Sequence, residues 1–378
     1  MRNFSLRNTV WRNRGHEFDW LAGNIFAPDK NYIVVGNKKE NELFLMQMDK
    51  PFINRSFMLS EDEEIGFKEN KIIICTAWDR EEYDRTVRKY SKLGYVENET
   101  LFPFEVFKIL YDVYVNDKIK LDRIEIFLTS CCTLNCEKCI AFIPYYKKPK
   151  IVPLQQLKDD ADILFEKVDY VGKLKILGGE GLLYPYLIEY VDYLHSNYEE
   201  KIGSIRIGTN GTVFPNEAVL EMCRKCKVIL DISDYTCAVP NMCMLDDVKE
   251  ICKAHEVGVD IKRTDEQWLD MGFPNNLPKE KTQEELNEHF YKCAMFCRQF
   301  SKGKYYFCCS NFSAICAELF PEDENDYFDF NKKFTKKELM EYELGYSRLG
   351  HTTFCGVCRG CSEEANDMHI PVARQINR

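Results

Sequence analysis

The strongest constraint on the fold is an alternation of strand-like and helix-like segments between about residues 122 and 263. Short apolar runs rich in β-branched residues predict buried strands at 124–130, 173–179, 204–211, 227–235 and 259–263. The segments between them have helical spacing, as at Leu157, Ala161 and Leu164. Such units give parallel strands with right-handed crossovers, so we predict an α/β fold with an open sheet or a full or partial barrel. Polar residues at the carboxyl ends of these strands become site candidates.

The cysteine content points to metal or redox chemistry. The chain has 378 residues and 18 cysteines, and its first residues lack the apolar stretch of an export signal. Because a reducing compartment keeps thiols free, we expect a cytoplasmic protein rather than a disulfide scaffold. Three groups of cysteines stand out, at 131–139, 293–316 and 355–361.

The charge pattern narrows the choice of partners. The net charge is -10, with 61 acidic and 51 basic residues, and no stripe of Lys and Arg alternates with aromatic residues. This pattern disfavours a nucleic-acid partner. No apolar stretch is long enough to span a bilayer, so we expect no membrane partner either.

The first cysteine group carries a motif. Cys132, Cys136 and Cys139 form CxxxCxxC directly after the first predicted strand. Three thiolates from one loop can hold three corners of a cubane iron–sulfur cluster and leave the fourth iron open, whereas a zinc loop, the alternative, would be closed by four ligands. The motif resembles the cluster loop of the radical S-adenosylmethionine (SAM) superfamily. This resemblance implies a partial (β/α)6 barrel, a [4Fe-4S] cluster and bound SAM.

Two segments at the ends of the next strands extend the resemblance. GGEG, after the second strand, is similar to the superfamily's GGE motif, which implies that Gly178, Gly179 and Glu180 hold the methionyl amino group. TNG ends the third strand, where similar enzymes have the same segment near the ribose of SAM. The resemblance therefore implies contacts from Thr209 and Asn210.

Two positions depart from the superfamily pattern. Lys138 precedes the third cysteine, where an aromatic residue is usual, so we expect Phe142 or Tyr145 to supply the ring. Gly181 replaces the usual proline and loosens the turn. Neither change removes a ligand, but both alter the surroundings of the adenine.

The C-terminal cysteines carry a second pattern. Cys293, Gly303 and Cys308 have the spacing C-x9-G-x4-C, in which a hairpin returns the second thiolate beside the first, and FCGVCRGC follows an intervening helix. This resembles the SPASM/twitch extension of radical SAM enzymes. The seven-cysteine SPASM spacing is not met, so the resemblance implies a twitch-like module with one auxiliary [4Fe-4S] cluster; a zinc site is the alternative. The implied ligands are Cys293, Cys308, Cys355 and Cys358, with Cys297 and Cys361 as substitutes.

Other side chains are candidates for catalysis or cofactor contact. Cys131 and Cys309 are left over as possible hydrogen donors, although a structural thiol is the alternative for each. Asp231 and Ser233 alternate onto one face of a buried strand, where they contact SAM or substrate or form a satisfied core network. We take Cys131, Cys309 and Asp231 as candidate catalytic residues, and Ser233 and Phe142 as cofactor contacts.

The segment before the repeating core predicts a separate module. Residues 31–103 have the pattern of a small α/β unit, but the turn NKKENE lacks the glycines of a pyrophosphate-binding loop, which favours a packing or recognition role. We predict three domains: an N-terminal α/β module at 1–118, a radical SAM partial barrel at 119–285 and a twitch-like cluster domain at 286–378.

The resemblance implies an enzyme that reductively cleaves SAM to a 5′-deoxyadenosyl radical and removes a hydrogen atom from its substrate. An external reductant such as flavodoxin or ferredoxin is the implied partner. We favour oxidation or epimerisation of a carbohydrate or polyol, because the twitch-like module resembles that of an aminocyclitol dehydrogenase. The alternative is a maturase of ribosomally made peptides, which calls for a winged-helix unit that residues 1–110 do not suggest. A non-catalytic iron–sulfur electron carrier would not need to bind SAM.

Overall fold

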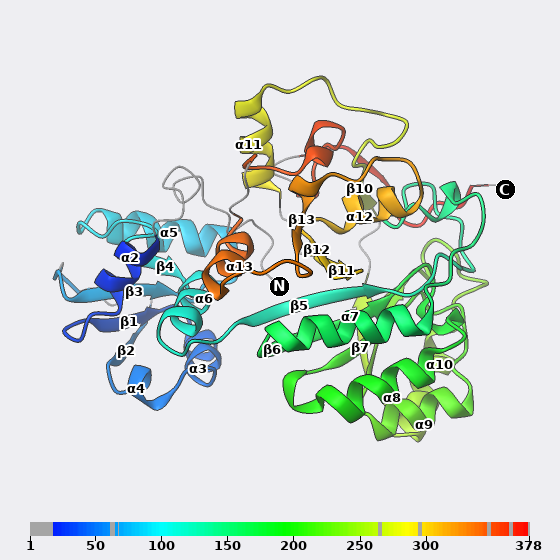
Figure 1. Ribbon diagram of the computed structural model, residues 1–378, viewed down its shortest axis with the longest axis horizontal. Coiled ribbons are helices and arrows are strands. Elements are labelled where there is room, and N and C mark those ends of the chain that lie inside the picture. The colour runs from blue at the N-terminus through cyan, green and yellow to red at the C-terminus, as the bar shows by residue number, and fades with distance from the viewer. Residues whose placement is uncertain are drawn as a thin grey trace. The chain divides into compact units, whose positions relative to one another are not determined.

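The computed structural model describes residues 18–60, 65–66, 68–263, 267–293, 297–345, 349–362 and 366–376. The chain divides into two compact units. Unit 1 comprises Met1–Ile119, Tyr291–Ala294 and Thr335–Gly350, and unit 2 comprises Lys120–Phe290, Met295–Phe334 and His351–Arg378. Figure 1 shows the elements of both units.

Unit 1 contains a small parallel sheet. The strand order is β2-β1-β3-β4, and each neighbouring pair is parallel. Four of the five residues of β1 and of β3 are buried, as expected for central strands covered on both faces. The strands are β1 (Asn31–Val35), β2 (Ser56–Leu59), β3 (Lys71–Cys75) and β4 (Leu101–Pro103). They all fall within the residues that the sequence assigns to a separate α/β module.

Several helices of unit 1 begin at polar caps. Asn37, Asp49 and Asp79 each accept a hydrogen bond from the backbone N–H three residues further on, which pairs a donor that the helix itself leaves open. The helices are α2 (Phe18–Ile25), α3 (Lys38–Leu45), α4 (Lys50–Ile53), α5 (Arg80–Ser91), α6 (Phe104–Tyr114) and α13 (Lys336–Glu343).

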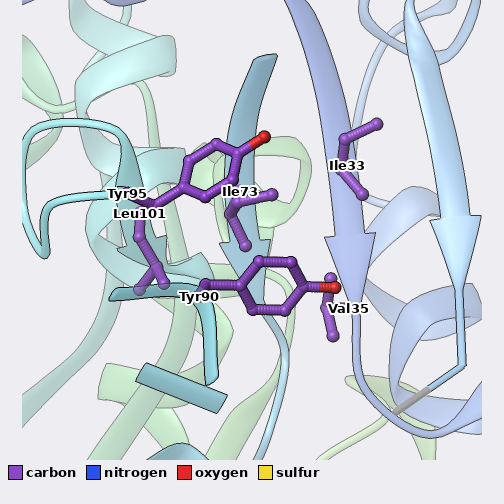
Figure 2. Close-up of a cluster of buried hydrophobic side chains, with 6 residues drawn as sticks. All are labelled: Ile33, Val35, Ile73, Tyr90, Tyr95 and Leu101. Carbon is purple, nitrogen blue, oxygen red and sulfur yellow. The ribbon is translucent and has the colours of Figure 1, made fainter. Parts of the chain in front are cut away.

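One core cluster of unit 1 joins three strands to the end of α5. Tyr90, on α5, and Tyr95, just beyond it, point toward the apolar side chains of β1, β3 and β4 (Figure 2). The cluster consists of Ile33, Val35, Ile73, Tyr90, Tyr95 and Leu101, and each side chain is at most 3% exposed. Unit 1 therefore has its own hydrophobic core.

Helix α13 belongs to unit 1 although it lies far along the chain. Lys337 pairs with Asp19 at 2.7 Å, and Lys336 pairs with Asp117 at 3.2 Å. These contacts return residues 335–350 to the N-terminal unit. The predicted division at residues 118 and 285 stays a prediction, because the compact units are not contiguous in sequence.

Unit 2 contains an eight-stranded sheet with the order β13-β12-β11-β5-β6-β7-β8-β9. The run from β5 to β9 is parallel throughout, and β11 is parallel to β5. The strands are β5 (Lys120–Phe127), β6 (Tyr170–Leu177), β7 (Ile205–Thr209), β8 (Ile229–Asp234), β9 (Gly258–Arg263), β11 (Gln299–Ser301), β12 (Lys304–Tyr306) and β13 (Tyr327–Asp329). The five strands predicted from residues 124 to 263 are thus confirmed. A short antiparallel pair, β10 (Gln267–Leu269) and β14 (His369–Pro371), stands apart.

Helices alternate with the parallel strands of unit 2, as predicted, and cover one side of the sheet (Figure 1). They are α7 (Leu154–Lys167), α8 (Leu187–Tyr198), α9 (Glu217–Lys225) and α10 (Leu245–Ala254). The α/β fold is therefore confirmed and is consistent with a partial barrel; the pairings between described strands do not close one. The sixth parallel strand, β11, comes after α11 (Gln283–Lys292) and pairs with β5 rather than with β9.

A tight hairpin joins β11 to β12. The two strands are antiparallel, and Ser301 pairs with Lys304 across a two-residue turn. Lys302 and Gly303 in that turn both have positive φ, 54° and 67°, the geometry that suits the twist of a two-residue hairpin. This is the hairpin predicted from the C-x9-G-x4-C spacing, and α12 (Cys309–Cys316) follows it.

The two faces of the parallel sheet differ in polarity. One face is apolar and buried, with Ile124, Ile126, Leu174, Ile176, Ile207, Leu230 and Ile232. Because side chains alternate along a strand, the opposite face carries the residues between these. That face is charged, with Arg123, Glu125, Lys175, Arg206, Asp231, Asp260 and Lys262. The apolar face is used for packing, so the charged face is the one whose side chains could contact a ligand.

Candidate active site

The three thiols of the CxxxCxxC loop lie in one apolar cluster at the carboxyl end of β5. Cys136 is buried there with Leu134 and Val239, while Cys132 and Cys139 pack against the same cluster. Burial is the largest influence on these thiols: it raises the pKa of Cys132 to about 12 and that of Cys136 to about 11. The thiols also raise each other's pKa, which shows that the loop brings them together.

Hydrogen-bond donors point at these sulfur atoms. The side-chain amide of Gln375 donates to Cys136 Sγ at 3.2 Å, and the backbone N–H of Leu134 donates to Cys132 Sγ at 3.4 Å. Burial raises the pKa of Cys139, and backbone N–H groups just after it partly oppose that effect. Donors of this kind stabilise thiolate ligands and tune an iron–sulfur cluster. The loop therefore fits a cluster held by three thiolates.

The GGEG segment is joined to the cysteine loop through the backbone. The N–H of Gly179 donates to the carbonyl of Thr129, and that of Glu180 donates to the carbonyl of Cys131, both at 2.7 Å. A β-carbon on Gly179 would lie 2.4 Å from the Cys131 carbonyl oxygen and 2.8 Å from Cys132 Cβ. Glycine is required here because two stretches of chain meet, a reason that the sequence motif by itself did not supply.

Glu180 joins the ends of two strands. Its carboxylate accepts hydrogen bonds from the backbone N–H of Leu182 at 3.0 Å and of Asn210 at 2.8 Å. The side chain is fully buried, and this burial raises its pKa although the hydrogen bonds oppose the shift. Glu180 thus connects the loop after β6 to the loop after β7. Its predicted contact with the amino group of SAM stays a prediction.

Asn210 reaches from the end of β7 back to the cysteine loop. Its side-chain amide nitrogen donates to Cys132 Sγ at 3.5 Å and to Thr133 Oγ1 at 3.1 Å. The neighbouring Thr209 hydroxyl accepts a hydrogen bond from the N–H of Gly211 at 3.2 Å. The structure therefore brings together the three segments that the sequence selected, at the carboxyl edge of β5, β6 and β7.

Asp231 lies on the charged face of the sheet. It pairs with Lys175 at 3.1 Å and with Arg206 at 2.5 Å, and Arg206 also pairs with Asp260 at 2.7 Å. Burial raises the pKa of Asp231, but the two cations outweigh burial and hold it below its usual value. These contacts support the satisfied network that the sequence left as the alternative. Ser233, two residues on, is partly buried on the same face.

Phe142 and Lys138 have partners other than a cofactor. Phe142 has φ of 54° and packs with Cys358 and Phe354 in a second apolar cluster. Lys138 pairs with Asp270 at 3.0 Å, which explains how a lysine is accommodated next to Cys139 in this loop. Packing of Phe142 against adenine stays a prediction.

The hairpin brings a second group of thiols together. Cys297 Sγ, Cys309 Sγ and a carboxylate oxygen of Glu125 lie within 4.8 Å of one another. The backbone N–H of Cys309 donates to the Cys297 carbonyl at 3.0 Å. Extending the β11–β12 register by two residues places Cys297 opposite Cys308. Sequence reasoning missed Glu125, because nothing marks a carboxylate in β5 as a neighbour of residues about 170 positions later.

The last cysteines lie in a short helical turn, Thr353–Gly356, and the loop after it. Cys358 Sγ accepts a hydrogen bond from the N–H of Gly360 at 3.3 Å, and the Lys281 ammonium donates to the carbonyls of Cys355 and Cys358 at 2.9 and 2.7 Å. Cys293 groups with unit 1, whereas Cys308, Cys355, Cys358 and Cys361 belong to unit 2. The predicted ligand set of the auxiliary cluster, including its substitutes, stays a prediction.

The comparison with family models decides the identity of the core. Residues 126–233 match the Radical SAM superfamily. This segment is a radical SAM domain. The match spans β5 to β8 and includes the cysteine loop, the GGEG segment and Asn210. The recognition from sequence is confirmed, together with SAM and a [4Fe-4S] cluster as the cofactors of such a domain.

Solved structures similar to this chain share little sequence with it. Streptococcus suis SuiB bound to S-adenosylmethionine has 14% identity over 55% of this chain and a TM-score of 0.32; the match covers 42% of SuiB, less than half of that protein. BtrN in complex with AdoMet and 2-DOIA has 16% identity, a TM-score of 0.43, and coverage of 66% of this chain and 98% of BtrN. Native anSMEcpe with bound AdoMet has 13% identity, a TM-score of 0.38, and coverage of 65% and 93%. No curated protein matches the chain.

Among the described residues, no helix combines the length and apolar character needed to cross a bilayer.

The contact at Gly179 makes a direct prediction. Replacing Gly179 with alanine pushes the chain against Cys131 and Cys132, so we expect the Gly179→Ala protein to take up less iron and sulfide on anaerobic reconstitution than the wild type. The matched control is Gly23→Ala, because a β-carbon there meets nothing within 4 Å. Equal iron content in all three proteins would contradict the requirement for glycine.

The Asp231 network predicts a loss of stability. Asp231→Asn leaves Lys175 without its carboxylate, so we expect unfolding to become easier by about 3 kcal/mol in urea at pH 7. Because the folded-state pKa of Asp231 is lowered, its contribution is present above about pH 4 and is lost as the pH falls below that value. The difference between the two proteins should therefore shrink in acid. Asp260→Asn is the control. Because the Asp260 carboxylate is half-exposed, this substitution should lower the free energy of unfolding by less than Asp231→Asn does.

Proposed function

We propose that this protein is an enzyme that uses SAM and a reduced [4Fe-4S] cluster to remove a hydrogen atom from a carbohydrate or polyol. An auxiliary [4Fe-4S] cluster assists the net oxidation or epimerisation, and an external flavodoxin or ferredoxin supplies electrons. The observation that carries the proposal is the meeting of the CxxxCxxC loop, the GGEG segment and Asn210 at one edge of the sheet.

The chain's own residues hold the cofactors and shield them. Cys132, Cys136 and Cys139 would ligate the cluster, which supplies, when bound, the electron that cleaves SAM to methionine and a 5′-deoxyadenosyl radical. The apolar cluster around these thiols, which includes Leu134 and Val239, would shield the centre from water. Backbone hydrogen bonds from Gly179 and Glu180 to the carbonyls of Thr129 and Cys131 would hold the cysteine loop in place for the cluster.

A small-molecule substrate is favoured over a peptide. A peptide maturase would call for a winged-helix unit near the N-terminus, and the described part of unit 1 is instead a parallel sheet with helices. The charged face beside the cluster loop also suits a polar substrate with several hydrogen-bonding groups. Peptide modification stays the alternative. An electron carrier is disfavoured, because the core is a radical SAM domain.

The auxiliary cluster rests on the C-terminal cysteines. The hairpin, the helix α12 and the Cys355–Cys358 turn all belong to unit 2 together with the radical SAM domain. All the cysteines are free thiols, and so many free thiols in one chain suit an iron–sulfur centre. Cys309 lies near Cys297 and Glu125, with their ligand atoms within 4.8 Å of one another. Cys131 and Cys309 stay the proposed hydrogen donors.

The iron content tests both clusters. We expect about eight irons per wild-type chain after anaerobic reconstitution, as two cubane clusters require. Replacing Cys132, Cys136 and Cys139 with alanine should remove about half of the iron and all formation of 5′-deoxyadenosine. Replacing Cys308 and Cys355 should remove the other half. Cys237→Ala, at an exposed thiol, is the control and should keep all of it. About four irons in the wild type would contradict the auxiliary cluster.

Deuterium transfer tests the substrate class. If the substrate is a carbohydrate or polyol, a perdeuterated sample of the right compound should place deuterium in the 5′-deoxyadenosine that the enzyme releases, as mass spectrometry would show. We expect transfer from members of a panel of deuterated sugars and polyols and none from deuterated peptides. Transfer from peptides alone would favour the maturase, and no 5′-deoxyadenosine at all would contradict radical SAM chemistry.

A further inference from the structure

The charged face of the unit 2 sheet holds more cations than carboxylates. Strand register places Glu125 beside Lys175, Lys175 beside Arg206, and Asp231 beside Asp260. The cations along the strands are Arg123, Lys175, Arg206 and Lys262, and the carboxylates are Glu125, Asp231 and Asp260. Lys173 adds a further cation at the exposed amino-terminal end of the same face. An excess of positive charge in a chain of net charge -10 calls for an explanation.

Three of these cations have carboxylate partners. Arg123 is paired with Glu125, Lys175 with Asp231, and Arg206 with both Asp231 and Asp260. Lys262 forms no ion pair within the described part of the chain. It is partly buried, and burial, Lys175 and Arg123 lower its pKa, while Asp231 opposes them only in part. The protein therefore keeps an ammonium group where its surroundings on balance disfavour the charge.

The strand register places Lys262 on the charged face of the sheet. Asp260, two residues before it on β9, pairs with Asp231 of β8. Because residues two apart on a strand point to the same side, Lys262 shares this face with both carboxylates.

Lys262 lies at the edge of the sheet where the candidate active site is built. It is the residue before the last one of β9 and pairs in register with Ser233 of β8. Tyr235, two residues beyond Ser233, packs against the apolar cluster that contains Cys136. Its pKa is raised, first by burial and also by the three thiols of the loop. A ligand at Lys262 would therefore lie on the same edge as the cysteine loop.

We propose that Lys262 binds an anionic group of the substrate, a carboxylate or a phosphate. This inference rests on the proposed function and narrows it: the substrate is an acidic or phosphorylated carbohydrate or polyol rather than a neutral one. An anion placed there would neutralise the unpaired ammonium and relieve its repulsion from Lys175 and Arg123. Among the described residues Lys262 has no carboxylate in an ion pair with it, and the substrate supplies the negative charge.

Binding of simple anions to the full-length, reconstituted protein tests the proposal. The proteins are the wild type, Lys262→Met, which keeps the length of the side chain without its charge, and Lys262→Arg, which keeps the charge. Lys253→Met, on the exposed surface of α10, is the control for net charge. The probes are inorganic phosphate and acetate, followed by calorimetry and by the midpoint of thermal unfolding.

We expect Lys262→Met to weaken the binding of the preferred probe at least about tenfold, as loss of a charge-assisted hydrogen bond should. Lys262→Arg should restore binding, and Lys253→Met should bind like the wild type. The probe that binds more tightly identifies phosphate or carboxylate as the group recognised. The probe should raise the unfolding temperature of the wild type but not of Lys262→Met, whose own unfolding temperature should be no lower because it lacks a repelled charge.

Two results would overturn the proposal. One is equal affinity of all the proteins for both probes, or no binding to the wild type. The other is a Lys262→Met protein that binds SAM about tenfold more weakly but binds 5′-methylthioadenosine, which lacks the amino-acid part of SAM, as tightly as the wild type does. Lys262 would then hold the carboxylate of SAM. Failure of the wild type to form 5′-deoxyadenosine would instead refute the proposed function and leave the anion-binding result standing.

Discussion

The radical SAM domain depends on the close contact between two loops that follow neighbouring parallel strands. The backbone of Gly179 and Glu180 donates to the carbonyls of Thr129 and Cys131, so the loop after β6 fixes the loop after β5. The contact is possible only because Gly179 has no side chain. Asn210 extends it to the next loop along the sheet. Since each loop is anchored to a strand, the register of the sheet sets the positions of the thiols.

The thiols that would ligate the cluster and the carboxylate of Glu180, which joins the loops around them, have different surroundings. The thiols lie in an apolar cluster, which raises their pKa, while Glu180 is buried and accepts backbone hydrogen bonds. Binding a cluster must therefore remove protons from thiols that the protein alone keeps neutral, so loading and proton release are linked. Donors such as Gln375 favour the thiolate form without bringing a full positive charge.

Much of the fold and part of the site could be predicted from the sequence. The five parallel strands could be predicted because each contains a run of apolar, often β-branched residues, and alternate side chains of these runs form the buried face of the sheet. The β11–β12 hairpin follows from Gly303, which the turn requires at positive φ. The partners of Glu125 could not be predicted, because its contact with Cys297 and Cys309 comes from β11 pairing beside β5. The same holds for α13, whose ion pairs return it to unit 1.

The sequence by itself determined the class of chemistry: three cysteines in one loop, a GGEG segment and a TNG segment, each following a predicted strand. These are local patterns, because ligand spacing and turn geometry involve residues close together in the chain. Only the tertiary structure decided which charges meet. Asp231 is neutralised by Lys175 and Arg206, while Lys262 has no such partner in the described residues. Pairing across strands depends on the register of the sheet, and no single segment of the sequence fixes that register.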